Sequence, residues 1–200
     1  MDSESAYNNA LAFAKSHYEN FPVVSFLIRK DLRKHVAIIY WFARTADDFA
    51  DEGNLTEEER LKKLSDFEIE FDNLSRGNFN SEFENALYLT ITEKSLNPLN
   101  FKNLLSAFKQ DVTKKRYNDY TELLDYCSRS ANPVGRLILE LHDIIGFTTE
   151  CINSIHRITF CGREKIESIV KTASAFFGYF FCFMHLFQRI QKKFYKINFT

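Results

Sequence analysis

The sequence predicts an all-α fold, and three observations lead to that prediction. Apolar residues recur at helical spacing through the first 146 residues. No hairpin signal, period-two alternation or βαβ rhythm occurs among them. The 200 residues include only 3 Pro and 6 Gly, which is untypical of a loop-rich or disordered chain. With 45% hydrophobic residues, this length suits one domain with a substantial core.

The first helix is expected over residues 5–20. It ends in the segment 17–22, because Pro22 keeps the residue before it out of the helical conformation. His17 stands at this helix end. It could meet a ligand, although a helix-end hydrogen-bonding group is the more ordinary interpretation.

The following helices are delimited by start and stop signals in the sequence. Such signals are side chains that cap free backbone groups at helix ends, prolines at first positions, and glycines at ends. Between them, apolar residues at helical spacing are expected to face inward. The signals in order are Asp31 (N-cap), Gly53 (stop), Thr56 with Glu59 and Ser81 with Glu84 (capping boxes), Pro98 (first helical residue) and Thr121 (start).

The last helical run contains a predicted break. The segment Ala-Asn-Pro-Val-Gly at 131–135 places a proline and a glycine inside it, so the helix should stop there and resume from Arg136 to Ile145. A helix bent around a ligand and an ordinary helix–loop–helix connection both fit this pattern.

Charge is concentrated on an otherwise core-like helix in the segment 40–53. An advance of about 100° per residue places Tyr40, Arg44, Asp47 and Asp51 in one stripe, and the opposite arc is apolar. The helix is therefore expected to pack on the apolar arc and to show the stripe on its other side. Two carboxylates four residues apart suit Mg²⁺, which takes one or two protein carboxylates with waters and phosphates. A solvated face with a weak Arg44–Asp47 pair is an equally weighted interpretation.

A second charged run follows at residues 110–117. Asp111 has the spacing for local ion pairs with Lys114 and Lys115, which accounts for much of the run. Alternatively, Arg116 and the neighbouring tyrosines point into a cavity that holds a phosphate, because the guanidinium fork matches phosphate oxygens.

Composition and motifs narrow the possible cellular compartments and functional classes of the protein. The 4 cysteines have no metal-finger or CxxC spacing, and the N-terminus does not resemble a cleavable signal. We therefore expect reduced thiols and a cytoplasmic protein. The common nucleotide-binding and hydrolase motifs do not occur. A nucleic-acid partner is not expected.

Four segments, taken in order, resemble the squalene and phytoene synthase family, most closely its bacterial hydroxysqualene synthase branch. The string YWFARTADDFADEG is similar to that family's first aspartate-rich motif. The resemblance covers about residues 5–146, so we expect a synthase domain at 1–146 and a divergent tail at 147–200. The four segments are 17–22, 39–53, 108–117 and 126–139.

The resemblance implies an isoprenoid-synthase-like bundle of helices around a central apolar cavity, incomplete at its C-terminus. It also implies a set of site residues. Mg²⁺ would be bound by Asp47 and Asp51, the diphosphate and substrate by Tyr40, Arg44, Arg116, Tyr117 and His17, and the catalytic residues would be Tyr126, near the reacting carbons, and Arg44.

The reaction implied by the resemblance is conversion of presqualene diphosphate to hydroxysqualene, with loss of diphosphate, in hopanoid biosynthesis. Head-to-head prenyl transfer from farnesyl diphosphate, as in squalene or phytoene synthase, is the alternative within the family. An inactive fragment that serves as a binding or membrane-associated module is the alternative of another class. A generic helical protein with a chance motif is the third hypothesis. No obligate protein partner is implied.

The sequence departs from the family at its end. Members carry a second aspartate-rich motif on a later helix, whereas no Asp follows Asp143 here. We therefore expect this chain to turn over prenyl diphosphate slowly or not at all. The tail 147–200 is rich in Phe and Lys, and we interpret the abrupt change as a shifted or truncated reading frame. Genuine divergence is the other explanation, with peripheral association at the inner face of the membrane through its aromatic and basic residues.

Overall fold

The structure, a computed structural model, describes residues 3–17, 28–114 and 116–143. All of its regular elements within these ranges are helical, which confirms the predicted all-α class. The predictions for 18–22 and for the tail 147–200 concern residues outside these ranges. The elements in order are α1 (Ser3–His17), the 3₁₀ turn η1 (Lys30–Leu32), α3 (Arg33–Asp51), α4 (Glu57–Ser75), α5 (Glu82–Glu93), α6 (Pro98–Thr113), α7 (Tyr120–Arg129) and α8 (Ala131–Leu141).

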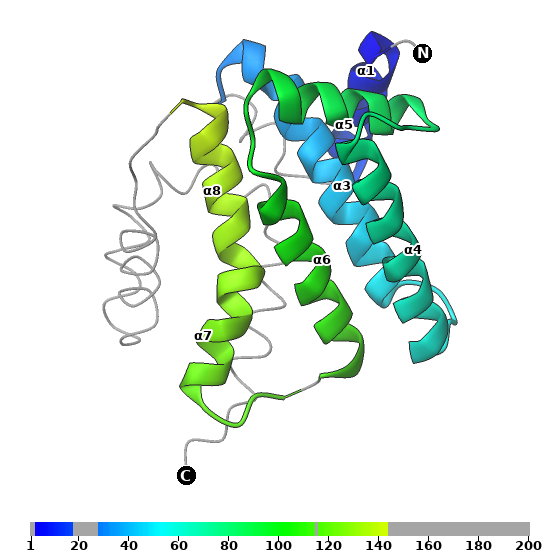
Figure 1. Ribbon diagram of the computed structural model, residues 1–200, viewed down its shortest axis with the longest axis vertical. Helices are drawn as coiled ribbons and strands as arrows, with labels where there is room; N and C mark the ends of the chain where they lie inside the picture. The colour runs from blue at the N-terminus through cyan, green and yellow to red at the C-terminus, as the bar shows by residue number, and fades with distance from the viewer. Residues whose placement is uncertain (1–2, 18–27, 115, 144–200) are drawn as a thin grey trace.

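Helix α3 is central to the described part of the chain, because it packs against α1, α4, α5 and α6. In Figure 1, α4 and α6 run beside α3, α5 crosses one end of them, and α7 and α8 follow one another beside α6. None of the helices described here is both long enough and apolar enough to cross a membrane.

Three helix starts follow the predicted signals, whereas the predicted start at Thr121 is wrong: α7 begins at Tyr120, and Asp119 is its N-cap because its carboxylate accepts the Glu122 amide at 2.8 Å. The Thr56 hydroxyl accepts a bond from the Glu59 amide at 3.2 Å, while the Glu59 carboxylate accepts one from the Thr56 amide at 2.8 Å. The Ser81 hydroxyl likewise accepts a bond from the Glu84 amide at 3.2 Å, but the Glu84 carboxylate accepts one from the Asn80 amide instead of the Ser81 amide, so only half of the predicted capping box forms there. Pro98 is the first residue of α6, where a missing amide hydrogen costs little because this position has no intrahelical acceptor. These signals were sufficient because each acts locally: the hydroxyls of Thr56 and Ser81 accept backbone amides of the first turn, and Pro98 has no amide hydrogen to pair.

Of the two predicted boundaries of α3, the start is wrong and the end is confirmed. Asp31 is not its N-cap: the carboxylate accepts a bond from Arg29 at 2.7 Å, and a 3₁₀ turn precedes the helix, which begins at Arg33. The stop at Gly53 is confirmed. The helix ends at Asp51, and Gly53 has a φ of +75°, which glycine adopts without strain.

The break before α8 is confirmed, but it lies one residue earlier than the segment 131–135. Ser130 is the joint between α7 and α8, and the predicted resumption at Arg136 is wrong because α8 already contains Pro133 and Gly135. Pro133 is the third residue of α8, where the backbone amides have no intrahelical partner. A proline there does not interrupt the helix.

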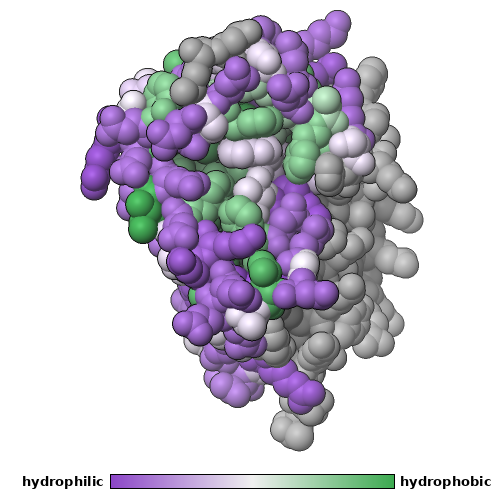
Figure 2. All heavy atoms as spheres, turned by 90° about the vertical axis from the view of Figure 1, so that its right-hand side faces the viewer, coloured by the Kyte–Doolittle hydropathy of each residue, from purple (hydrophilic) through white to green (hydrophobic). Residues whose placement is uncertain are grey.

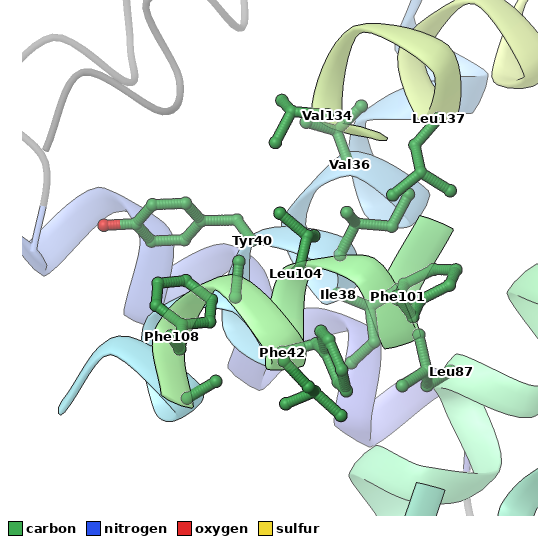
Figure 3. Packing of buried hydrophobic residues seen from close by; sticks show 14 of the residues in the cluster. Val36, Ile38, Tyr40, Phe42, Leu87, Phe101, Leu104, Phe108, Val134 and Leu137 are labelled. Atoms are coloured by element: carbon green, nitrogen blue, oxygen red, sulfur yellow. The ribbon is translucent and has the colours of Figure 1, made fainter. Parts of the chain in front are cut away.

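Aromatic side chains form the middle of the core. Phe42 of α3 is fully buried, and its ring centroid lies 5.1 Å from Phe67, 5.4 Å from Phe71 and 5.2 Å from Phe101. Figure 3 shows Phe42 and Phe101 among aliphatic side chains from α3, α5, α6 and α8. On the face seen in Figure 2, hydrophilic side chains predominate among the described residues, and apolar ones occupy a smaller area.

Candidate functional site

The charged stripe of α3 does not face solvent as a whole. Tyr40 is 7% exposed and Asp47 is 5% exposed, whereas Asp51 is exposed. The prediction that the helix shows this entire stripe on its outer side is therefore wrong for Tyr40 and Asp47. The reason is that neighbouring helices surround α3 on several sides. In Figure 3, the Tyr40 hydroxyl points away from the packed apolar side chains.

Arg44 joins three carboxylates, two within α3 and one on the residue that directly follows the helix. Its Nη1 lies 3.3 Å from Asp47 Oδ2, and its Nη2 lies 2.7 Å from Asp48 Oδ1 and also contacts Glu52. The predicted Arg44–Asp47 pair is thus confirmed, within a larger cluster. Because the Arg44 side chain is only 15% exposed, these contacts supply the counter-charges that a poorly hydrated guanidinium requires.

The turn after α3 is held by a second arginine. Arg60 of α4 donates to the backbone carbonyls of Glu52 at 3.1 Å, Gly53 at 2.7 Å and Leu55 at 3.2 Å. These bonds tie the end of α3 to the start of α4. They therefore restrict the acidic end of α3, where Asp51 and Glu52 lie.

A buried phenol and a buried carboxylate meet between α6 and α7. Tyr126 is fully buried, and its hydroxyl donates to Asp111 Oδ2 at 2.8 Å. Burial raises the pKa of the Tyr126 hydroxyl well above its usual value of 10, and the nearby Tyr117 and Cys127 and, to a smaller extent, the charge of Asp47 add to the increase. The carboxylate of α3 thus lies within electrostatic reach of Tyr126.

The role of Asp111 was missed from the sequence. Local pairing with Lys114 was predicted, but Lys114 pairs with Glu122 instead, and Lys115 is outside the described residues. Asp111 is 5% exposed. One sequence signal was available: Asp111 follows the inward residue Phe108 by three positions, which places it on the buried face of α6.

The other predicted binding residues lie in different environments. Tyr117 is buried, its ring centroid is 5.3 Å from that of Tyr126, and its hydroxyl accepts a bond from Gln110 at 3.4 Å. Arg116 is exposed, so the structure does not bury it beside Tyr126. His17 is the last residue of α1, and its side chain is not among those described.

The donor chemistry at the end of α3 fits Mg²⁺. Asp47 and Asp51 are four residues apart on one helix, and Mg²⁺ commonly takes one or two protein carboxylates with waters and phosphates. Across the described ranges, no group of three or more His, Cys, Asp and Glu side chains has an arrangement suited to a metal ion. The predicted metal ligands therefore stay a prediction.

Comparisons with known proteins place the chain in a family. Residues 14–151 match the family Squalene/phytoene synthase. The chain is 41% identical over 135 residues to a hydroxysqualene synthase from Rhodopseudomonas palustris, covering 66% of this chain and 44% of that protein. It is 38% identical over 136 residues to a hydroxysqualene synthase from Zymomonas mobilis, covering 66% and 45%.

A solved structure is also similar. The crystal structure of squalene synthase HpnC from Alicyclobacillus acidocaldarius superposes with a TM-score of 0.67 at 32% sequence identity, over 72% of this chain and 54% of that one. The chain therefore spans less than half the length of the hydroxysqualene synthases it matches and about half of this structure. The similarity extends across all the described residues from the end of α1 onward.

Proposed function

The chain belongs to the squalene/phytoene synthase family, and from this premise we propose that it acts on a prenyl diphosphate in the manner of hydroxysqualene synthase. The proposed substrate is presqualene diphosphate. The proposed product is hydroxysqualene, formed with loss of diphosphate, as a step of hopanoid biosynthesis. The observation that carries the proposal is the buried Tyr126, on whose hydroxyl the carboxylate of Asp47, the ion-pair partner of Arg44 on α3, acts electrostatically.

The diphosphate end of the site is proposed to lie along α3. Asp47 and Asp51 would hold Mg²⁺, which when bound neutralises charge on the leaving diphosphate. Arg44 is proposed to supply a fixed positive charge that needs no metal, and its guanidinium fork suits phosphate oxygens. Tyr40, one turn before Arg44, is proposed to donate its hydroxyl to the same group.

The carbon end of the site is proposed to lie at Tyr126 and Tyr117. Their rings present negatively charged faces, and such faces attract cations. Burial of both residues limits the access of water, which strengthens electrostatic interactions there. Tyr126 and Arg44 are therefore proposed as the catalytic residues. Water capture of the resulting cation would give the alcohol product.

The division of the chain into two parts, and the contact of one part with a membrane, are proposed from the sequence. Residues 1–146 are proposed as the synthase part, and 147–200 as a separate tail. The tail combines an aromatic segment at 175–187 with basic residues at 188–196. Such a combination supports contact with anionic lipid, at the inner face of the membrane, where a long prenyl substrate would be concentrated.

The test is a single-turnover assay with the full chain in excess over presqualene diphosphate, with and without Mg²⁺, so that slow conversion is still detected. Hydroxysqualene that forms only with Mg²⁺ is the expected result. Farnesyl diphosphate in a parallel assay tests the second candidate within the family, head-to-head prenyl transfer. The absence of any Mg²⁺-dependent product from either substrate would contradict the proposed activity.

A further inference from the structure

The carboxylate of Asp111 occupies an unfavourable position. It lies in the last turn of α6, which ends at Thr113, and only 5% of the residue is exposed. The C-terminal end of a helix carries partial negative charge, which repels a carboxylate. Burial further penalises a charged group unless hydrogen bonds compensate it. The carboxylate therefore needs a compensating donor, and Tyr126 supplies one at 2.8 Å.

This hydrogen bond fixes the direction of the Tyr126 hydroxyl. An ionised carboxylate can only accept, so the phenol donates. The phenol proton then points to Asp111, and the oxygen lone pairs point elsewhere. A hydroxyl held in this way presents the negative side of its dipole to other groups. It is a poor donor of that proton to a reacting atom, because donation would break its hydrogen bond to a buried carboxylate.

Further negative charge acts on the same phenol. Asp47 of α3 influences Tyr126 electrostatically, and the ring of Tyr117 lies 5.3 Å from the ring of Tyr126. The Asp111 carboxylate and the Tyr117 ring thus adjoin the phenol of Tyr126, and the charge of Asp47 acts on the same phenol. Such an environment stabilises a positive charge and disfavours a negative one.

We propose that Asp111 is a positioning residue, which holds Tyr126 as a stabiliser of positive charge and prevents it from acting as a proton donor. The proposal rests on the proposed function, in which a carbocation forms beside Tyr126, and assigns a role in that site to a residue of α6. Asp111 acts through Tyr126, which it contacts directly.

The decisive variant is Asp111→Asn, because the amide oxygen can still accept the Tyr126 hydrogen bond while the charge is removed. Two probes of similar shape separate charge from packing: N,N-dimethyldodecylammonium and the neutral alcohol 2-methyltetradecan-2-ol, both below their aggregation concentrations. The full chain should bind the ammonium more tightly than the alcohol. Asp111→Asn should weaken ammonium binding about tenfold and alcohol binding less than about twofold.

Asp66→Asn is the matched control, since it removes one exposed carboxylate of α4 and should change neither affinity. Equal weakening of both probes in Asp111→Asn would indicate a purely structural role and overturn the proposal. The same conclusion would follow if the wild-type chain showed no preference for the ammonium.

A cycle with Tyr126→Phe tests whether Asp111 acts through the phenol. In the Tyr126→Phe background, Asp111→Asn should weaken ammonium binding less than it does in the wild-type chain, because only the direct effect of the charge remains, and full additivity would contradict the positioning role. The ¹³Cζ NMR signal of Tyr126 provides a readout independent of ligands, assigned by its loss in Tyr126→Phe. It should move in Asp111→Asn, and an unchanged signal would refute the hydrogen bond. None of these measurements involves Mg²⁺ or diphosphate, so failure of the proposed function would be recognised separately.

Discussion

Arg44 Nη1 lies 3.3 Å from Asp47 Oδ2 on α3, the central helix of the described chain. The side chains are 15% and 7% exposed, so both charges are largely removed from water. In such surroundings the removal of one partner is costly, because the other charge is left without full compensation. Arg44 and Asp47, which are proposed to bind the diphosphate and its metal ion, therefore also contribute to the stability of the fold.

A double-mutant cycle on this pair tests that conclusion. Arg44→Gln and Asp47→Asn should each lower the free energy of unfolding, with a coupling energy of about 1–2 kcal/mol. The exposed pair Lys102–Asp72, with side chains 42% and 39% exposed, is the control and should couple by less than about 0.5 kcal/mol. Urea denaturation provides the measurement. Equal coupling in both pairs would contradict the burial argument.

Arg60 should position the acidic end of α3. Arg60→Ala removes three bonds to backbone carbonyls of the turn 52–55, and should cost about 1–3 kcal/mol of stability. Hydrogen exchange of the amides in this turn should accelerate as well. Arg76→Ala, at an exposed arginine, is the control and should change the unfolding free energy by less than about 0.5 kcal/mol. Unchanged exchange at the turn in Arg60→Ala would show that other contacts hold it.

Phe42 should be the most costly aromatic residue to truncate. It is 1% exposed and lies between rings from α4 and α6. Phe42→Ala should lower the unfolding free energy by about 3–5 kcal/mol, through lost burial and a residual cavity. Ile69→Ala, at a side chain 59% exposed, should cost less than about 0.5 kcal/mol in the same denaturation experiment. Similar costs at both positions would show that the core is not packed as described.

His35 should make stability depend on pH. It is 2% exposed, and burial, assisted by the positive charges of Lys94 and Lys34, lowers the pKa of its imidazole from 6.5 to about 4. Asp31 opposes this shift, and Glu93, whose carboxylate is 4.0 Å from His35 Nε2, is itself half exposed. The folded protein therefore holds His35 neutral under conditions in which the unfolded chain would protonate it.

The direction in which the unfolding free energy changes with pH follows from the number of protons that each state binds. Between pH 6.5 and about 4 the unfolded state binds the extra proton, so this contribution is fully present above pH 6.5 and is lost as the pH falls toward 4. The loss should reach roughly 3 kcal/mol at most. The difference between the wild-type chain and His35→Gln, measured by denaturation from pH 7 to pH 5, isolates this contribution. A difference that is constant with pH would contradict it.

The sequence predicted the helices well where a local side chain satisfies a helix end, as at Thr56, Ser81 and Pro98. It failed at Asp31, because Arg29 competes for the carboxylate, and this competition depends on a conformation that spacing does not reveal. The end of α3 at Gly53 was predictable because a positive φ is a local property of glycine.

The site was predictable in part. Helical periodicity placed Tyr40, Arg44 and Asp47 together, but it could not show which side of α3 is buried when several helices pack around it. Asp111 illustrates the limit more clearly. Its sequence neighbours offered plausible ion pairs, whereas its partner Tyr126 is 15 residues away on another helix.

The carboxylates of α3 are proposed to hold Mg²⁺ for a diphosphate, and isothermal titration of the full chain with inorganic diphosphate at fixed Mg²⁺ tests this most directly. Wild-type protein should bind diphosphate at least about tenfold more tightly with Mg²⁺ than without it, and Asp47→Asn and Asp51→Asn should each remove most of that gain. The control Asp66→Asn should retain it. Mg²⁺-dependent diphosphate binding that survives both the Asp47 and the Asp51 substitutions unchanged would contradict the account.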